Sequence, residues 1–105
     1  MVAKSRKEQI EEMLAEDPRD SFLLYGLAME HLSTGAEDLA LKALQNLMAL
    51  QPDYPPGYLQ AGQLLARLGK EPEARDVYRV GIQVAQKAGD SHAAGEMENF
   101  LSLLD

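Results

Sequence analysis

The sequence contains no cysteine and no tryptophan, and only 6% of its 105 residues are aromatic. Without cysteine, disulfide bonds and thiolate chemistry are excluded, and the redox compartment stays undetermined. No apolar run approaches the roughly 18 residues that a membrane-spanning helix needs. The basic N-terminal stretch MVAKSRKEQI is not followed by an apolar segment. We therefore expect no secretory signal, a cytoplasmic location and no membrane partner.

Positive charge is also scarce, since 17 acidic residues face 10 basic ones and the net charge is -7. A surface of this sign repels the phosphates of nucleic acids, so we expect no nucleic-acid partner. The hydrophobic content of 46% is typical of a folded globular chain. At this length, one domain is expected.

The chain repeats itself at a spacing of 34 residues, with bulky residues falling on bulky ones and small residues on small ones. The matching pairs are Leu24 and Tyr58, Ala28 and Gly62, Gly35 and Gly69, Ala40 and Ala74, and Leu44 and Tyr78. Ile10, Leu14 and Pro18 precede Leu44, Met48 and Pro52 by the same step. The N-terminal segment is therefore a partial copy of the second half of the unit.

Each unit has the pattern of two helices, because apolar residues recur at helical spacing between glycine and proline signals. We expect an all-α fold of about five helices, without β-strands, in one domain over residues 1–105. Its parts are an N-terminal half-repeat or capping helix at 4–17, repeat 1 at 21–54, repeat 2 at 55–88 and a C-terminal capping helix at 90–105.

Gly62 lies inside one of these helices, where glycine costs about 1 kcal/mol relative to alanine. Gly62 and Ala28 occupy the same place on the first helices of the two units, and Ala74 and Ala40 share a place on the second helices. Close helix packing needs small residues at the contact. We therefore predict that the two helices of a unit pack closest at these small residues.

With this spacing the sequence resembles the tetratricopeptide repeat, whose 34-residue unit follows a W-x2-L-G-x2-Y…A-x3-F…P pattern. In the first unit, the positions of this pattern are occupied by Leu24, Leu27, Ala28, His31, Ala40, Leu44 and Pro52. In the second unit, the same positions are occupied by Tyr58, Ala61, Gly62, Leu65, Ala74, Tyr78 and Gln86. The tryptophan slot thus holds Leu or Tyr, and the final proline is lost after the second unit. The resemblance implies a helix-turn-helix repeat that forms a right-handed superhelical solenoid.

Members of this family are mostly non-enzymatic adaptors that hold a peptide or another protein in a concave groove, lined by the first helix of each unit. Carried over by register, the resemblance implies a groove wall of Phe22, Tyr25, Met29, Ser33, Leu59, Gln63, Ala66 and Arg67. Some members grip chaperone tails with a clamp of Lys, Arg and Asn. The matching places here carry no positive charge, so we expect an apolar or basic protein segment as the partner instead.

Phe22, Tyr25 and Met29 share one helical face, because they are spaced by three and four residues. This face is either a binding surface or a face covered by the N-terminal helix or another chain. A second hypothesis is a structural self-assembly module that forms a homo-oligomer through the groove or the C-terminal helix. The residues expected to do so are Phe100, Leu101 and Leu104.

Residues that could carry chemistry are isolated from one another. His31 occupies a slot that normally holds a packed tyrosine, and His92 has no second ligand at metal-binding spacing. Glu96 and Glu98 point to different faces of a helix. The glycines stand singly, unlike those of a phosphate-binding loop. We therefore expect no enzyme activity, no metal and no cofactor.

Overall fold

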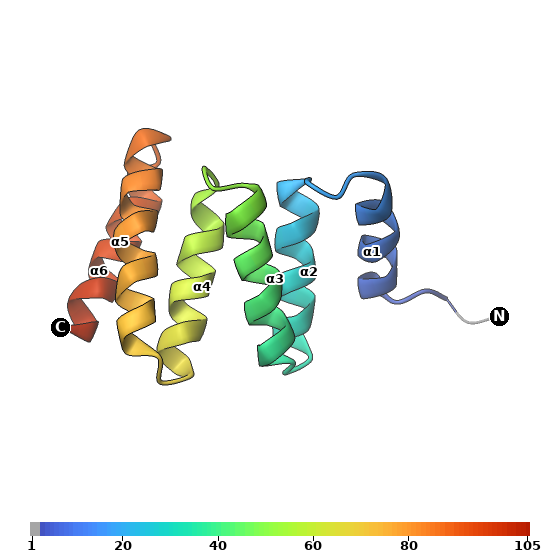
Figure 1. The fold of residues 1–105 in the computed structure, drawn as a ribbon, viewed down its shortest axis with the longest axis horizontal. Coiled ribbons are helices and arrows are strands. Elements are labelled where there is room, and N and C mark those ends of the chain that lie inside the picture. Colours follow the sequence, from blue (N-terminus) through green and yellow to red (C-terminus); the bar gives the residue numbers. More distant parts are fainter. Residues whose placement is uncertain (1–2) are drawn as a thin grey trace.

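The structure, a computed structural model, describes residues 3–105, which form six α-helices and no strand. Their bounds are α1 Arg6–Glu16, α2 Ser21–Ser33, α3 Glu37–Leu50, α4 Pro55–Arg67, α5 Glu71–Lys87 and α6 Ser91–Leu104. They line up in chain order from one end of an elongated molecule to the other (Figure 1), which measures 51 × 29 × 20 Å. The all-α helical-repeat fold is confirmed. The six helices are one more than the expected number of about five, and they match the expected parts, which are two helices in each repeat and one helix at each end.

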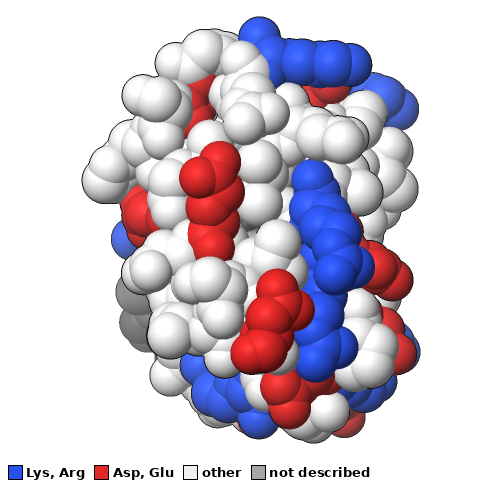
Figure 2. Space-filling view, turned by 90° about the vertical axis from the view of Figure 1, so that its left-hand side faces the viewer, with Lys and Arg blue, Asp and Glu red and all other residues white. Residues whose placement is uncertain are grey.

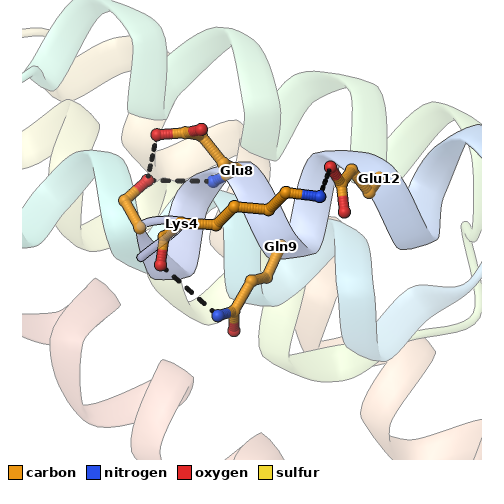
Figure 3. Close-up of polar contacts among 5 residues, drawn as sticks. Lys4, Glu8, Gln9 and Glu12 are labelled. Atoms are coloured by element: carbon orange, nitrogen blue, oxygen red, sulfur yellow. Dashed lines mark hydrogen bonds and ion pairs between the residues drawn. The ribbon is translucent and has the colours of Figure 1, made fainter. Parts of the chain in front are cut away.

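The first helix begins with a network of polar contacts (Figure 3). The Ser5 hydroxyl accepts a hydrogen bond from the Glu8 backbone N–H at 3.1 Å and donates one to the Glu8 carboxylate at 3.2 Å. Lys4 pairs with Glu12, and the Gln9 amide donates to the Lys4 carbonyl. A serine cap followed three residues later by a glutamate is a known signal for the start of a helix. These contacts fix the N-terminal end of α1.

Local signals also set the limits of the other helices. The Asp20 and Asp90 side chains cap α2 and α6 by accepting from backbone N–H groups at 3.0 Å. Three helices end at a glycine with positive φ, which favours glycine: Gly35 at 76°, Gly69 at 81° and Gly89 at 73°. α5 has 17 residues against 14 in α3. The longer α5 agrees with the loss of the final proline in the second unit.

Two buried clusters make up the core, and α4 contributes to both. The first cluster, between α2, α3 and α4, contains Leu24, Ala28, Ala40, Leu44, Leu47, Ala61 and Leu64. The second, between α4, α5 and α6, contains Tyr58, Leu65, Ala74, Tyr78, Ala85, Ala93, Ala94 and Met97. We refer to them as the first and second core clusters. Burial on two sides makes α4 the central helix of the molecule.

Gly62 lies at a close approach between α4 and α5, as predicted, but its neighbour is different from the one predicted. A Cβ added at Gly62 would lie 2.6 Å from Cζ of the Tyr78 ring, much closer than a real contact allows. The atoms nearest to this position thus belong to the bulky Tyr78 ring and not to a small residue. The glycine makes room for a ring that is only 1% exposed.

Candidate protein-binding surface

An open pocket of about 320 Å³ lies between α1 and α2, which we call the α1–α2 pocket. Its walls are formed by Arg6, Gln9, Ile10 and Met13 from α1 and by Phe22, Leu23, Tyr25, Gly26 and Met29 from α2. Phe22 is 72% exposed and Met13 is 48% exposed. Large apolar side chains thus face solvent around a concave surface, a feature that often marks an interaction site.

Tyr25 is held in place by a second aromatic ring. Its ring meets that of Tyr54 edge to face, with the centroids 6.1 Å apart and the planes at 73°. Tyr54 directly precedes α4, so this contact joins α2 to the next unit. Burial, followed by Tyr25 and Asp20, raises the pKa of Tyr54. The pocket wall at Tyr25 therefore packs against a residue of the next unit.

The structure places the predicted groove residues in two different environments. Phe22, Tyr25 and Met29 come together in the α1–α2 pocket. Leu59 and Ala66 on α4 are half-buried against the second core cluster, to which α6 contributes. Tyr25 and Met29 are likewise half-buried, against the first core cluster, so Phe22 is the one apolar residue of the predicted wall that is largely exposed.

The polar members of the predicted wall lie outside the α1–α2 pocket. Arg67 is exposed, and its Nε lies 2.8 Å from the Glu37 carboxylate on α3. The Ser33 hydroxyl donates to the Glu30 carbonyl at 2.8 Å, and Gln63 is half-buried.

α1 lies against the face of Phe22, Tyr25 and Met29, as the alternative of cover by the N-terminal helix expected, but the two helices leave a pocket between them. Ile10 had been matched to the buried Leu44 by the repeat spacing, and it is indeed buried, at 5% exposure. Met13 matches Leu47 by the same spacing, yet Leu47 is fully buried and Met13 is half-exposed. The two slots hold similar apolar residues in different surroundings, so the sequence alone carries no signal for the uncovered face of α1.

The predicted self-assembly residues of α6 are engaged within their own chain. The Phe100 ring stacks on that of Tyr78, with centroids 6.0 Å apart and planes at 13°. Phe100, Leu101 and Leu104 all pack against the second core cluster. Leu103, by contrast, is 74% exposed. At this end of the molecule, uncharged side chains cover much of the surface, and acidic and basic ones lie interspersed (Figure 2).

The residues that could carry chemistry remain scattered in the described part of the chain. No group of three or more His, Asp or Glu side chains is placed to hold a metal ion within residues 3–105. His92 lies on the surface of α6, where its Nε2 is 2.7 Å from the Glu96 carboxylate. Over the same residues, no helix is both long and apolar enough to cross a membrane.

No protein-family model matches this chain. A TPR repeat-containing protein of Pseudomonas aeruginosa is 32% identical over 98 residues, which cover 93% of each chain. The solution structure of a tetratricopeptide repeat domain protein from Salinibacter ruber is 33% identical. It superposes with a TM-score of 0.80 over 84% of this chain and 89% of that one.

A third likeness is one of fold alone. The structure of PcrH in complex with the chaperone binding region of PopD is 16% identical, with a TM-score of 0.85 over 93% of this chain and 74% of that one. The identity and coverage of the Pseudomonas relative decide the family. This chain belongs to the tetratricopeptide repeat (TPR) family, whose domains are protein–protein interaction modules and typically non-catalytic.

Proposed function

We propose that this TPR domain is an adaptor that captures a segment of a partner protein in the α1–α2 pocket. The observation that carries the proposal is the pocket that Phe22, Tyr25 and Met29 of α2 line together with Ile10 and Met13 of α1, where the apolar side chains of Phe22 and Met13 are exposed. In this proposal, residues 21–54 and 55–88 are the two repeats, and residues 4–17 and 90–105 are the capping helices.

Binding at this surface would rest on the burial of apolar area, which stabilises a complex by about 25 cal/mol per Å² before the costs of association are subtracted. Part of that cost is already reduced, because Tyr25 is ordered by its contact with Tyr54. Aromatic side chains of this kind often dominate the binding energy of an interface. Ser33, Leu59, Gln63, Ala66 and Arg67 would provide weaker contacts beside the pocket.

The relatives support the mode of binding without naming the partner. PcrH, a protein of the same fold, has been solved with a region of another protein, PopD. A protein of this fold can therefore hold a segment of a second chain. The net charge of -7 makes a basic or uncharged segment a better ligand here than an acidic one.

A matched pair of surface variants tests the proposal. Phe22→Glu places a charge at the mouth of the α1–α2 pocket, and Leu103→Glu places one on an equally exposed apolar residue of α6. Tagged chains would be used to capture partners from a lysate of the source cells, with quantification by mass spectrometry. We expect Phe22→Glu to lose at least about tenfold of the specifically captured protein. We expect Leu103→Glu to retain it.

Both variants should keep the melting temperature of the unmodified chain, because both side chains are exposed. Equal capture by Phe22→Glu and the unmodified chain would contradict the proposal. Loss of capture in Leu103→Glu alone would move the binding surface to α6.

A further inference from the structure

α1 is held by fewer buried side chains than α3 and α5, the helices that occupy the equivalent place in the two repeats. Three residues of α3 and four of α5 are buried, whereas Ile10 is the one buried residue of α1. Leu14 adds a half-buried contact with the first core cluster. α3 and α5 each lie between two helices, but α1 stands at the end of the row and packs on α2 (Figure 1). Its docking therefore depends mainly on one neighbouring helix.

The turn between α1 and α2 is, by contrast, firmly anchored. Nη2 of Arg19 donates to the Leu50 carbonyl at 3.1 Å, and the Gln51 side-chain amide donates to the Arg19 carbonyl. The Asp20 backbone N–H donates to the Asp17 carbonyl at 3.3 Å, and the Asp20 side chain caps α2. Leu50 and Gln51 lie at the end of α3, so these bonds tie the turn to the first repeat. The turn is thus a fixed base for a loosely docked helix.

The far end of α1 is joined to α2 by a single ion pair. Nε of Arg6 lies 2.9 Å from the Glu30 carboxylate, and within residues 3–105 no other ion pair links these two helices. The Arg6 side chain is 73% exposed. Exposed pairs of this kind contribute little to stability and are screened by salt. The contact can therefore open and close readily.

We propose that α1 is a hinged lid: it opens as one unit about the anchored turn while α2 to α6 stay folded, and the Arg6–Glu30 pair is its latch. The closed lid seats Ile10 over Gly26, where an added Cβ would lie 3.5 Å from Cδ1 of Ile10. Opening lifts Ile10 from this seat and separates the two walls of the α1–α2 pocket. The open state then admits a wider ligand to α2 than the closed pocket of about 320 Å³ does. The motion of α1 does not depend on the proposed adaptor function.

Hydrogen exchange of the unmodified chain, followed by NMR, tests the motion directly. An isolated helix of 11 residues is marginal in water, so α1 loses its hydrogen bonds once it leaves α2. We expect the backbone N–H groups from Ile10 to Asp17 to share one protection factor, at least about a hundredfold below that of Leu44 in α3. Simple fraying would instead give a gradient, with fast exchange at Ile10 and slow exchange at Asp17, next to the anchored turn.

A matched pair of single cysteines tests the same motion at the side chains. The chain contains no cysteine, so Ile10→Cys and Leu44→Cys each carry one thiol, at the same slot of the repeat. Ile10 is 5% exposed and Leu44 is fully buried. We expect a thiol-reactive dye to label Ile10→Cys at least about a hundredfold faster than Leu44→Cys. The labelling rate of Ile10→Cys should depend weakly on urea, because opening the lid exposes little surface, and that of Leu44→Cys should depend on it steeply.

A matched pair of glutamate variants tests the latch. Glu30→Gln releases Arg6, whereas Glu37→Gln releases Arg67, whose Nε lies 2.8 Å from the Glu37 carboxylate at the α3–α4 junction. We expect Glu30→Gln to speed the exchange of the α1 amides by about two- to fivefold, and Glu37→Gln to leave it unchanged. Added salt should speed this exchange in the unmodified chain and have less effect in Glu30→Gln.

Equal protection of α1 and α3 would overturn the lid, and so would a gradient of exchange from Ile10 to Asp17. Equal labelling rates with the same urea dependence for Ile10→Cys and Leu44→Cys would also overturn it. Equal exchange of the α1 amides in Glu30→Gln and Glu37→Gln would overturn the latch. Each of these outcomes leaves the adaptor function standing. That function fails separately, if Phe22→Glu captures the full set of lysate partners.

Discussion

The two repeat units fill the same four buried slots with side chains of different size. The α2–α3 unit holds Leu24, Ala28, Leu44 and Leu47, and the α4–α5 unit holds Tyr58, Gly62, Tyr78 and Gly81. In the second unit, the close contacts run between Gly62 and Tyr78 and between Gly81 and Tyr58. Each gain in bulk is matched by a loss at the facing slot. Because protein interiors are close-packed, the repeat preserves the filled volume of a facing pair while its individual residues change.

The same exchange changes how each unit meets the next helix. Leu47 of α3 reaches forward to Gly57 at the start of α4, whereas Gly81 of α5 receives Met97 from α6. The large side chain thus comes from the earlier helix at one junction and from the later helix at the other. The caps Asp20 and Tyr54 are 34 residues apart, but Tyr54 and Asp90 are 36 apart. The longer α5 thus delays the start of α6 by two residues.

The largest effect on stability is expected when a large side chain replaces Gly62 of the second unit. Gly62→Leu forces a side chain into the Tyr78 ring, which an added Cβ alone would already contact at 2.6 Å. We expect the free energy of unfolding to fall by about 2–3 kcal/mol, in the upper part of the range for overpacked cores. Urea unfolding followed by circular dichroism measures the change. Gly95→Leu, at an open site on α6, is the control and should cause no comparable loss.

A double variant sharpens this comparison by giving the second unit the pair of the first. Gly62→Ala with Tyr78→Leu reproduces Ala28 and Leu44 at the same slots. If volume is exchanged between facing residues, the double variant is more stable than the sum of the two single changes indicates, by about 1–2 kcal/mol of coupling energy. Additive changes would show that the Gly62–Tyr78 contact does not determine the choice of residues.

The repeat pattern predicted the small slot at Gly62 but not the residue that fills the space above it. A small residue at one position indicates only that little space is available beside the helix there. The 34-residue spacing shows that Ala28 and Gly62 are equivalent. The residue that contacts Gly62 depends on which facing position holds a larger side chain. Leu44 and Tyr78 are equivalent positions and both bulky, so the repeat pattern does not distinguish them. Helix ends were easier to predict, because caps and left-handed glycines act within a few residues.

The α1–α2 pocket was half predictable for a similar reason. The stripe of Phe22, Tyr25 and Met29 follows from spacing along one helix. Gly26 lies on the same face of α2, whereas Met13 joins the pocket only through the docking of α1 on α2. Ile10 is the one buried residue of α1. Local patterns therefore carry little information about where this helix rests.

An effect of similar size is a loss of stability at high pH that is expected for Tyr78 in the second unit but not for Leu44, which holds the same slot in the first unit. Burial raises the pKa of Tyr78 from its ordinary value of 10.0 to about 12, whereas Leu44 has no proton to lose. Between these values the unfolded chain releases the proton first, so stability falls as the pH rises from 10 towards 12. We expect a loss on the order of 1–2 kcal/mol from this group.

Urea unfolding of the unmodified chain and of Tyr78→Phe at pH 8 to 12 measures this loss. Tyr54 and Tyr58 also have pKa values raised by burial, so the variant should lose stability less steeply without becoming insensitive to pH. Parallel curves for the two chains would show that the Tyr78 hydroxyl is not protected from ionisation by the fold.

The smallest effect on stability concerns a hydrogen bond at the position shared by Leu24 and Tyr58, which only the second unit can make. The Tyr58 hydroxyl donates to the Pro52 carbonyl at 2.8 Å and ties α4 to the turn that follows α3. Leu24 holds this slot in the first unit and has no hydroxyl. Tyr58→Phe keeps the ring and removes the donor, so we expect a loss of about 1 kcal/mol. Tyr25→Phe, which keeps the edge contact with Tyr54, is the control and should change the free energy of unfolding less. An equal change in both variants would mean that the bond to Pro52 adds nothing to stability, and the two units would then differ in packing alone.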